Sequence, residues 1–239
     1  MLLYIIRHGD PIYDPDSLTP LGCRQAEAVA KRLALHGLDK IYCSTSNRAI
    51  LTAKPTCEIL KLEPEQLDFT NENYAWAELT LTEPDGTGRR WLFQDPQIIE
   101  QIHTPEFRAL GDRWYDYPEF QKYNFQKGID RIYTETDGFL EQLGYEHIRY
   151  TGKYKVTKAN DQRVALFAHQ GFGLAFLSCI LDIPYPTFCT HFDINHSGVT
   201  VVEFAENGGY CVPKILMHSS DAHLYREGLP TRYINGIYL

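Results

Sequence analysis

The sequence has no excess of positive charge and no long apolar run. Its 239 residues include 23 Lys or Arg and 31 Asp or Glu, which gives a formal net charge of −8 at pH 7. A chain this acidic is poorly suited to bind nucleic acid or an anionic membrane through its overall charge. No hydrophobic stretch approaches the length of a membrane span. We therefore expect neither a nucleic-acid partner nor a membrane partner.

Cysteine motifs and a signal peptide are also missing. The six cysteines are scattered, with no C-x-x-C pair, so neither a disulfide framework nor a common zinc motif is indicated. Met1 leads directly into a five-residue apolar run, which is shorter than the hydrophobic region of a signal peptide. We interpret the chain as a cytoplasmic protein with reduced thiols and without a metal or other cofactor. No heptad repeat indicates an oligomeric state.

The sequence does contain an alternation of short apolar runs and amphipathic segments. An apolar run over 2–6 precedes a loop with two prolines over 10–17, and Thr19-Pro20 then begins a predicted helix that ends at Gly37. A second strand over 40–44 and a second helix from Ser46 follow. Later strands are expected over 164–168 and 198–205, with a helix over 170–181 between them. This order predicts an α/β fold with a mostly parallel central sheet.

The pattern loosens between about residues 80 and 160, where Arg, Trp, Tyr and Phe are frequent. A helix is expected over 128–143, but the region is longer than a crossover between two sheet strands requires. We therefore predict a single domain over 1–239 with a helical or irregular lid inserted at about 80–160. Four arginines of this insertion are candidates for substrate selectivity: Arg89, Arg90, Arg108 and Arg113.

Basic side chains follow three of the predicted strands. Arg7 and His8 end the first strand, Arg48 begins the helix after the second, and His169 follows the late strand. Ligands bind beyond the carboxyl ends of parallel strands, so these side chains meet if the strands are neighbours. Two guanidiniums and two imidazoles suit a phosphoryl group, which arginine grips through paired oxygens and histidine can attack. Gly9 has no side chain, so its backbone N–H is expected to approach an oxyanion.

Four motifs in this order resemble the histidine phosphatase superfamily, the phosphoglycerate-mutase-like phosphatases and mutases: RHG, LTPLGCRQA, STSNRAILTA and FAHQGF. The resemblance implies a three-layer sandwich with a mostly parallel central sheet. It also implies that His8 is the nucleophile that becomes phosphohistidine, while Arg7, Arg48 and His169 hold the phosphoryl group.

Members of that family also carry a carboxylic acid that protonates the leaving group. Glu72 lies at the family's usual spacing from the second arginine, and Glu78 is the alternative acid. His191 and His196 are expected to be structural or to support the site.

Three functions remain open from the sequence. The first is a metal-independent phosphatase that hydrolyses a small phosphorylated metabolite through a phosphohistidine. The second is phosphoryl transfer of the phosphoglycerate mutase type, although Asp10 and Pro11 follow RHG where the mutases carry other residues. The third is a non-catalytic module that binds a phosphorylated ligand on the same fold. The presence of both histidines and both arginines argues against a degenerate site of this kind.

Overall fold

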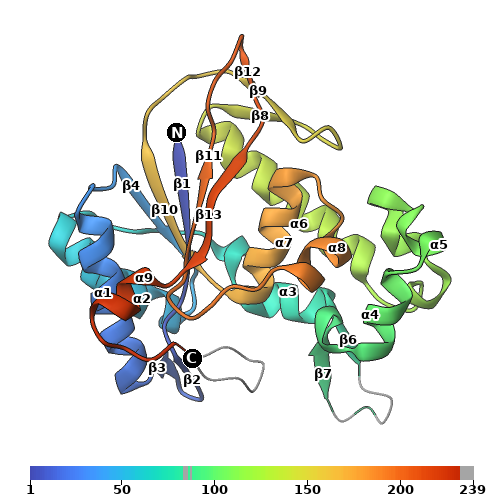
Figure 1. Ribbon diagram of the computed structural model, residues 1–239, viewed down its shortest axis with the longest axis horizontal. Coiled ribbons are helices and arrows are strands. Elements are labelled where there is room, and N and C mark those ends of the chain that lie inside the picture. Colours follow the sequence, from blue (N-terminus) through green and yellow to red (C-terminus); the bar gives the residue numbers. More distant parts are fainter. Residues whose placement is uncertain (83–85, 87, 232–239) are drawn as a thin grey trace.

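The computed structural model describes residues 1–82, 86 and 88–231. It shows a central sheet with helices on both faces (Figure 1). The sheet has six strands in the order β13 (Lys214–Ser220), β11 (Val199–Glu203), β1 (Leu2–Arg7), β10 (Arg163–Ala168), β4 (Lys40–Cys43) and β5 (Glu65–Gln66). The last four strands of this order run parallel to one another, whereas β11 is antiparallel to β1, and β13 is antiparallel to β11. The predicted α/β fold with a mostly parallel sheet is confirmed.

The sheet buries two separate apolar layers, one on each face. Leu3 of β1 and Leu166 of β10 pack with residues of α6 (Phe125–Gln142) and α7 (Gln170–Leu181). Ile6 of β1 and Phe167 of β10 pack with α1 (Pro20–Ala34) and α2 (Asn47–Leu60) on the other face. Since neighbouring side chains of a strand point to opposite faces, the continuous apolar sequence of β1 is what a strand covered on both sides requires.

The first helix begins as the sequence predicts. The side chain of Thr19 accepts a hydrogen bond from the backbone N–H of Gly22, and Pro20 occupies the first helical position. The helix ends at Ala34 rather than at Gly37. In α2, Ser46 is the N-terminal cap and Pro55 lies inside the helix.

Two short features differ from the predictions. The expected loop over 10–17 is a hairpin of β2 (Pro11–Tyr13) and β3 (Asp16–Leu18). The strand expected over 198–205 is present as β11, and β13, which was not predicted from the sequence, pairs with its outer edge. Most of β13 is exposed or half-buried, so it lacks the apolar pattern of a buried strand.

The predicted lid region is divided between the core and a smaller insertion. Helix α6 belongs to the sandwich, because its Phe139 ring packs edge-on against Tyr42 of β4 with ring centroids 5.1 Å apart. Strands β8 (Tyr145–Ile148) and β9 (Lys153–Val156) form a three-stranded sheet with β12 (Tyr210–Cys211). The part of the region that can cover the pocket is therefore shorter than the expected span of 80–160.

The insertion begins with β6 (Thr80–Thr82), β7 (Arg89–Trp91) and α4 (Pro96–Ile102), on the right of Figure 1. It continues through α5 (Pro105–Arg108) to the short helices that precede α6. The remaining elements are α3 (Glu72–Glu78), α8 (Tyr185–His191), α9 (Ala222–Arg226), η1 (Asp68–Thr70), η2 (Leu92–Gln94), η3 (Gly111–Asp116) and η4 (Pro118–Phe120). Among the residues described, no helix combines the length and apolar character needed to span a bilayer.

Candidate active site

Three neighbouring strands bring the predicted basic residues to one edge of the sheet. Strand β10 lies between β1 and β4 and is parallel to both, with Arg7 beside Ala168 and Phe167 beside Cys43. The residues that follow these strand ends are His8, Ser44 and His169. The sequence predicts that the basic residues meet if these strands are neighbours. They are neighbours in the structure.

His8 is buried and held in one tautomer. Its Nδ1 lies 2.7 Å from the carbonyl oxygen of Gly9, so Nδ1–H donates and Nε2 carries the lone pair. Burial, Arg7 and His169 hold the pKa of His8 well below its usual range. The ring centroids of His8 and His169 are 5.2 Å apart. His8 is therefore a neutral imidazole with an unprotonated Nε2, near the guanidiniums of Arg7 and Arg48.

The two arginines are buried and fixed by different parts of the chain. Arg7 donates from Nη1 to the backbone oxygen of Ile194 at 2.6 Å. Arg48 donates from Nη1 to Oδ1 of Asp16 at 2.9 Å and from Nη2 to Nδ1 of His169 at 3.1 Å. Within the described ranges, the buried Nε of each arginine has no hydrogen-bond partner. Because buried donors are nearly always satisfied, these two N–H groups indicate a place for an anion.

His169 is buried and bonded at both ring nitrogens. Its Nδ1 accepts from Arg48, so the proton lies on Nε2, which is 2.9 Å from Oγ of Ser44 and 3.2 Å from Oγ of Ser46. Burial, Arg48 and Arg7 hold the pKa of His169 well below its usual range. The second histidine is therefore also neutral.

Glu72 reaches this group of residues, and Glu78 is bonded elsewhere. The carboxylate of Glu72 accepts from the backbone N–H groups of Gly171 at 2.9 Å and Phe172 at 3.0 Å, in the first turn of α7. Burial raises the pKa of Glu72, although the two N–H groups and the arginines of the pocket oppose the rise. Oε2 of Glu78 instead accepts from Nε of Arg131 on α6 at 2.7 Å.

The backbone N–H of Gly9 does not have the role expected from the sequence. Its backbone N–H donates to Oγ1 of Thr52 at 3.0 Å, so this amide is already engaged and is not directed at an oxyanion. A Cβ at Gly9 would lie 2.6 Å from the backbone oxygen of Gly22. The glycine is therefore needed because the loop after β1 packs directly on the first turn of α1. Thr52 in turn donates to the backbone oxygen of Arg48 at 2.7 Å, which joins this loop to α2.

Several supporting residues were not identified from the sequence. Asp16 of the hairpin holds Arg48 and also accepts from the backbone N–H of Asn47 at 2.8 Å. Ser44 and Ser46 bond to His169 from the loop after β4. Ser44 and Ser46 lie in the motif STSNRAILTA, but the motif does not show these contacts, since they join segments that are distant in the sequence.

His191 and His196, which were expected to be structural or to support the site, lie in different places. The ring centroid of His196 is 5.7 Å from that of His8, and its Nδ1 is 3.6 Å from Oδ1 of Asp10. His191 is packed edge-on against His103 instead. Only His196 of the pair borders the imidazole of His8.

The insertion's arginines are largely engaged in local contacts. Arg90 pairs with Asp95 and Arg113 pairs with Asp116, while Arg89 donates to Oγ1 of Thr80 at 2.9 Å. Arg108 lies in the last turn of α5. None of these contacts involves a residue of the pocket, so the selectivity predicted for these arginines has no support in the geometry.

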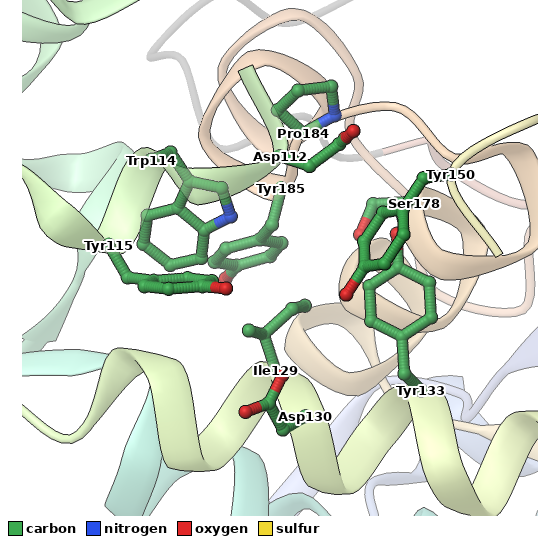
Figure 2. A pocket seen from close by; sticks show the side chains of 10 residues that line it. All are labelled: Asp112, Trp114, Tyr115, Ile129, Asp130, Tyr133, Tyr150, Ser178, Pro184 and Tyr185. Carbon is green, nitrogen blue, oxygen red and sulfur yellow. The ribbon is translucent and has the colours of Figure 1, made fainter. Parts of the chain in front are cut away.

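A second cavity lies away from the sheet edge and is too small for a substrate. Figure 2 shows it between aromatic side chains of the insertion, α6 and α8, with Trp114 and Tyr115 on one side and Tyr133 on the other. Its volume is about 10 Å³, and a single water needs about 10–15 Å³. This cavity is therefore not a candidate active site.

Two buried arginines, two neutral histidines and a carboxyl group at one sheet edge define a pocket suited to a tetrahedral oxyanion. Residues 3–117 match the model of the histidine phosphatase superfamily (branch 1). Phosphoserine phosphatase 1 of Hydrogenobacter thermophilus is 25% identical over 161 residues, which cover 62% of this chain and 67% of that protein. Both matches agree with the family resemblance predicted from the sequence, and the named relative is a phosphatase.

Solved structures agree on the fold. A mutant phosphoserine phosphatase of Entamoeba histolytica in complex with phosphoserine aligns with a TM-score of 0.59 at 19% identity, covering 93% of this chain and 98% of that chain. A mycobacterial glucosyl-3-phosphoglycerate phosphatase gives 0.60 at 17% identity, with 92% and 99% covered. The α-ribazole phosphatase of Shigella flexneri gives 0.58 at 17% identity, with 92% and 96% covered. The phosphoglycerate-mutase-like sandwich is therefore the fold of this chain.

Proposed function

We propose that this protein hydrolyses small phosphomonoesters through a phosphohistidine formed on Nε2 of His8. The observation that carries the proposal is the pair of buried arginines, each with an Nε–H that lacks a partner among the described residues, beside a neutral imidazole. A phosphoryl group supplies oxygens for both guanidiniums and a phosphorus atom for the imidazole.

In the first step, the lone pair of His8 Nε2 forms a bond to phosphorus while the bond to the ester oxygen breaks. The carboxylic acid of Glu72 gives its proton to the leaving alkoxide. Arg7 and Arg48 neutralise the charge on the equatorial oxygens, and most of the rate acceleration comes from this fixed charge. Nδ1–H of His8 keeps its bond to the Gly9 carbonyl and so holds the ring in line.

In the second step, water attacks the phosphohistidine. Glu72, now ionised, takes a proton from the water as the oxygen bonds to phosphorus and the bond to Nε2 breaks. Inorganic phosphate leaves, and both side chains return to their starting forms. No metal is needed in this scheme, because the arginines supply the positive charge.

The surroundings of Glu72 suit both steps. Burial favours the protonated acid, while the N–H groups of Gly171 and Phe172 favour the carboxylate. An acid that serves first as donor and then as base needs both its protonated and its ionised form. Glu78 remains the alternative acid.

The named relatives favour hydrolysis over a mutase reaction, because they are phosphatases of phosphoserine, glucosyl-3-phosphoglycerate and α-ribazole. The substrate is accordingly a small phosphorylated metabolite. The cytoplasmic location expected from the sequence is part of this proposal.

Hydrolysis of p-nitrophenyl phosphate tests the proposal. His8→Ala should lower kcat/KM by at least about 10³-fold, while His36→Ala, an exposed control in the turn after α1, should leave it unchanged. Isomerisation of 3-phosphoglycerate that requires the bisphosphate would instead support the mutase. A folded protein that turns over no phosphoester would support the binding module.

A further inference from the structure

A groove of about 270 Å³ is lined in part by Gln170, the residue that directly follows His169. It lies between η2, the start of α7, and α8 with the loop that follows. Its lining includes Phe93, Gln94, Gln170, Thr190, Phe192 and Asp193. This volume is slightly below the range of about 300–1,000 Å³ typical for drug-sized ligands, so it suits part of a small metabolite.

The groove and the phosphate pocket share a wall. Gln170 directly follows His169, and its side-chain amide donates to the Asp193 carboxylate. Asp193 also accepts from the backbone N–H of Ile194 at 2.6 Å. The backbone oxygen of Ile194 is the acceptor that holds Arg7. A phosphate bound by Arg7 therefore has this groove as a neighbouring space for its ester substituent.

The walls of the groove combine aromatic rings with neutral polar groups. Phe93 stacks on Trp91 with ring centroids 5.8 Å apart and an angle of 8° between the planes. Trp91 in turn packs so closely on Gly171 that a Cβ there would lie 2.2 Å from the indole. On the other side, Phe192 stacks on Phe188 with centroids 4.7 Å apart. Both aromatic walls are therefore backed by further rings.

The charge of the groove is negative. Asp193 supplies a carboxylate, Gln94 and Gln170 supply amides, Thr190 supplies a hydroxyl, and His191 supplies an imidazole that packs against His103. None of the described residues that line it is a lysine or an arginine. A leaving group with a carboxylate would therefore meet the Asp193 carboxylate and no lysine or arginine side chain of the lining.

We infer that this groove binds the leaving group of the substrate and selects uncharged polyhydroxylated alcohols, that is, sugars or polyols, over carboxylated ones. The inference rests on the proposed phosphatase function. The C–H faces of a sugar pack on aromatic rings, while its hydroxyls bond to amides and carboxylates. The amides, the hydroxyl and the carboxylate that line this groove can form hydrogen bonds with the hydroxyls of such a substrate.

The first test compares kcat/KM for neutral sugar and polyol monophosphates with values for phosphoserine and 3-phosphoglycerate. The best sugar or polyol phosphate should exceed both carboxylated substrates by at least about tenfold. Equal values, or a preference for a carboxylated substrate, would overturn the assignment of the groove.

The second test introduces a cation. Gln94→Arg should shift the ratio of kcat/KM at least about tenfold towards 3-phosphoglycerate, because the guanidinium can pair with its carboxylate. Gln97→Arg makes the same change in charge at an exposed position of α4 outside the lining, and should leave the ratio unaltered. An unchanged ratio in Gln94→Arg, with a native circular dichroism spectrum, would contradict the inference.

Hydrolysis of p-nitrophenyl phosphate separates failure of this inference from failure of the proposed function. If hydrolysis depends on His8 but neither test shows discrimination, only the role of the groove is wrong. If hydrolysis is absent or persists in His8→Ala, the proposed function fails and the groove's role fails with it.

Discussion

Arg48 donates a hydrogen bond from Nη2 to Nδ1 of His169 over 3.1 Å. The contact joins α2 to the end of β10 and requires His169 to be neutral, with its proton on Nε2. Asp16 holds the other end of the guanidinium at 2.9 Å. The position of Arg48 is therefore set before a ligand arrives, and preorganised charge of this kind is what stabilises a phosphoryl transition state.

The hairpin aspartate should matter for activity although it is outside the pocket. Asp16→Asn removes the charge that holds Arg48, and we expect kcat/KM to fall about tenfold, since hydrogen bonds to charged groups contribute about 1.5–3 kcal/mol. Asp14→Asn makes the same charge change in the same hairpin and should have little effect. Steady-state kinetics on both variants measures the difference, and equal losses would show that net charge alone is responsible.

The pH dependence of kcat/KM should reflect the shifted pKa values of His8 and Glu72. His8 must be neutral to attack, and because burial and Arg7 lower its pKa, the acidic limb should lie below 6.5. Glu72 must be protonated to assist the leaving group, and because burial raises its pKa, the alkaline limb should lie above 4.5. A profile measured with an alkyl phosphate tests both limits.

Replacing the proposed acid should remove the alkaline limb. Glu72→Gln is expected to lower the rate on an alkyl phosphate by about 10²–10⁴-fold, with a smaller loss on p-nitrophenyl phosphate, whose phenolate leaves without a proton. Glu78→Gln should keep the profile, because that side chain pairs with Arg131. The reverse ranking would transfer the acid role to Glu78.

Gly22 should tolerate no side chain. A Cβ there would lie 2.2 Å from the backbone oxygen of Asp10, so Gly22→Ala should lower the free energy of unfolding by about 1–3 kcal/mol and displace the loop after His8. Gly138→Ala, at a position of α6 with open space around it, should instead raise stability by about 0.5–1 kcal/mol. Urea unfolding measures both variants, and similar losses would contradict the packing argument.

His147 should make stability depend on pH. Its Nδ1 is 2.8 Å from Asp137 and its Nε2 is 3.1 Å from Asp182. Burial alone would lower the pKa of His147, but these carboxylates outweigh it and raise the pKa above 6.5. The stabilisation is therefore complete below the unfolded-state pKa and is lost as pH rises through the folded-state pKa.

His147→Gln should consequently cost about 1–3 kcal/mol of the free energy of unfolding near pH 6 and less near pH 9. Urea titrations at the two pH values measure this difference. His36→Gln, at an exposed position, serves as the control. A loss that is equal at both pH values would show that packing, rather than charge, is the contribution of His147.

Residues at strand ends could be predicted from the sequence because parallel topology fixes where they go. His8 and His169 each follow a buried apolar run, and adjacent parallel strands deliver such residues to one edge. Arg48 follows in the same way from the second strand. The helix that begins at Thr19 was also identified correctly, since its cap and proline are local signals.

Contacts that depend on tertiary packing could not be predicted. Asp16 lies in a segment that reads as a loop, and its bond to Arg48 exists only because the hairpin folds onto α2. The role of Gly9 depends on the approach of α1, which no local pattern encodes. Helix α6 was expected at the correct place but was assigned to a lid, because one apolar face does not reveal which surface it covers.

Trapping the covalent intermediate tests the central claim most directly. Rapid mixing with a phosphomonoester, an alkaline quench, peptide mapping and ³¹P NMR should show phosphate on His8, attached to Nε2, since Nδ1 is bonded to the Gly9 carbonyl. The label should be absent from His8→Ala. Phosphate on another residue or on Nδ1 of His8, or turnover of wild-type enzyme without any phosphoenzyme, would contradict the account.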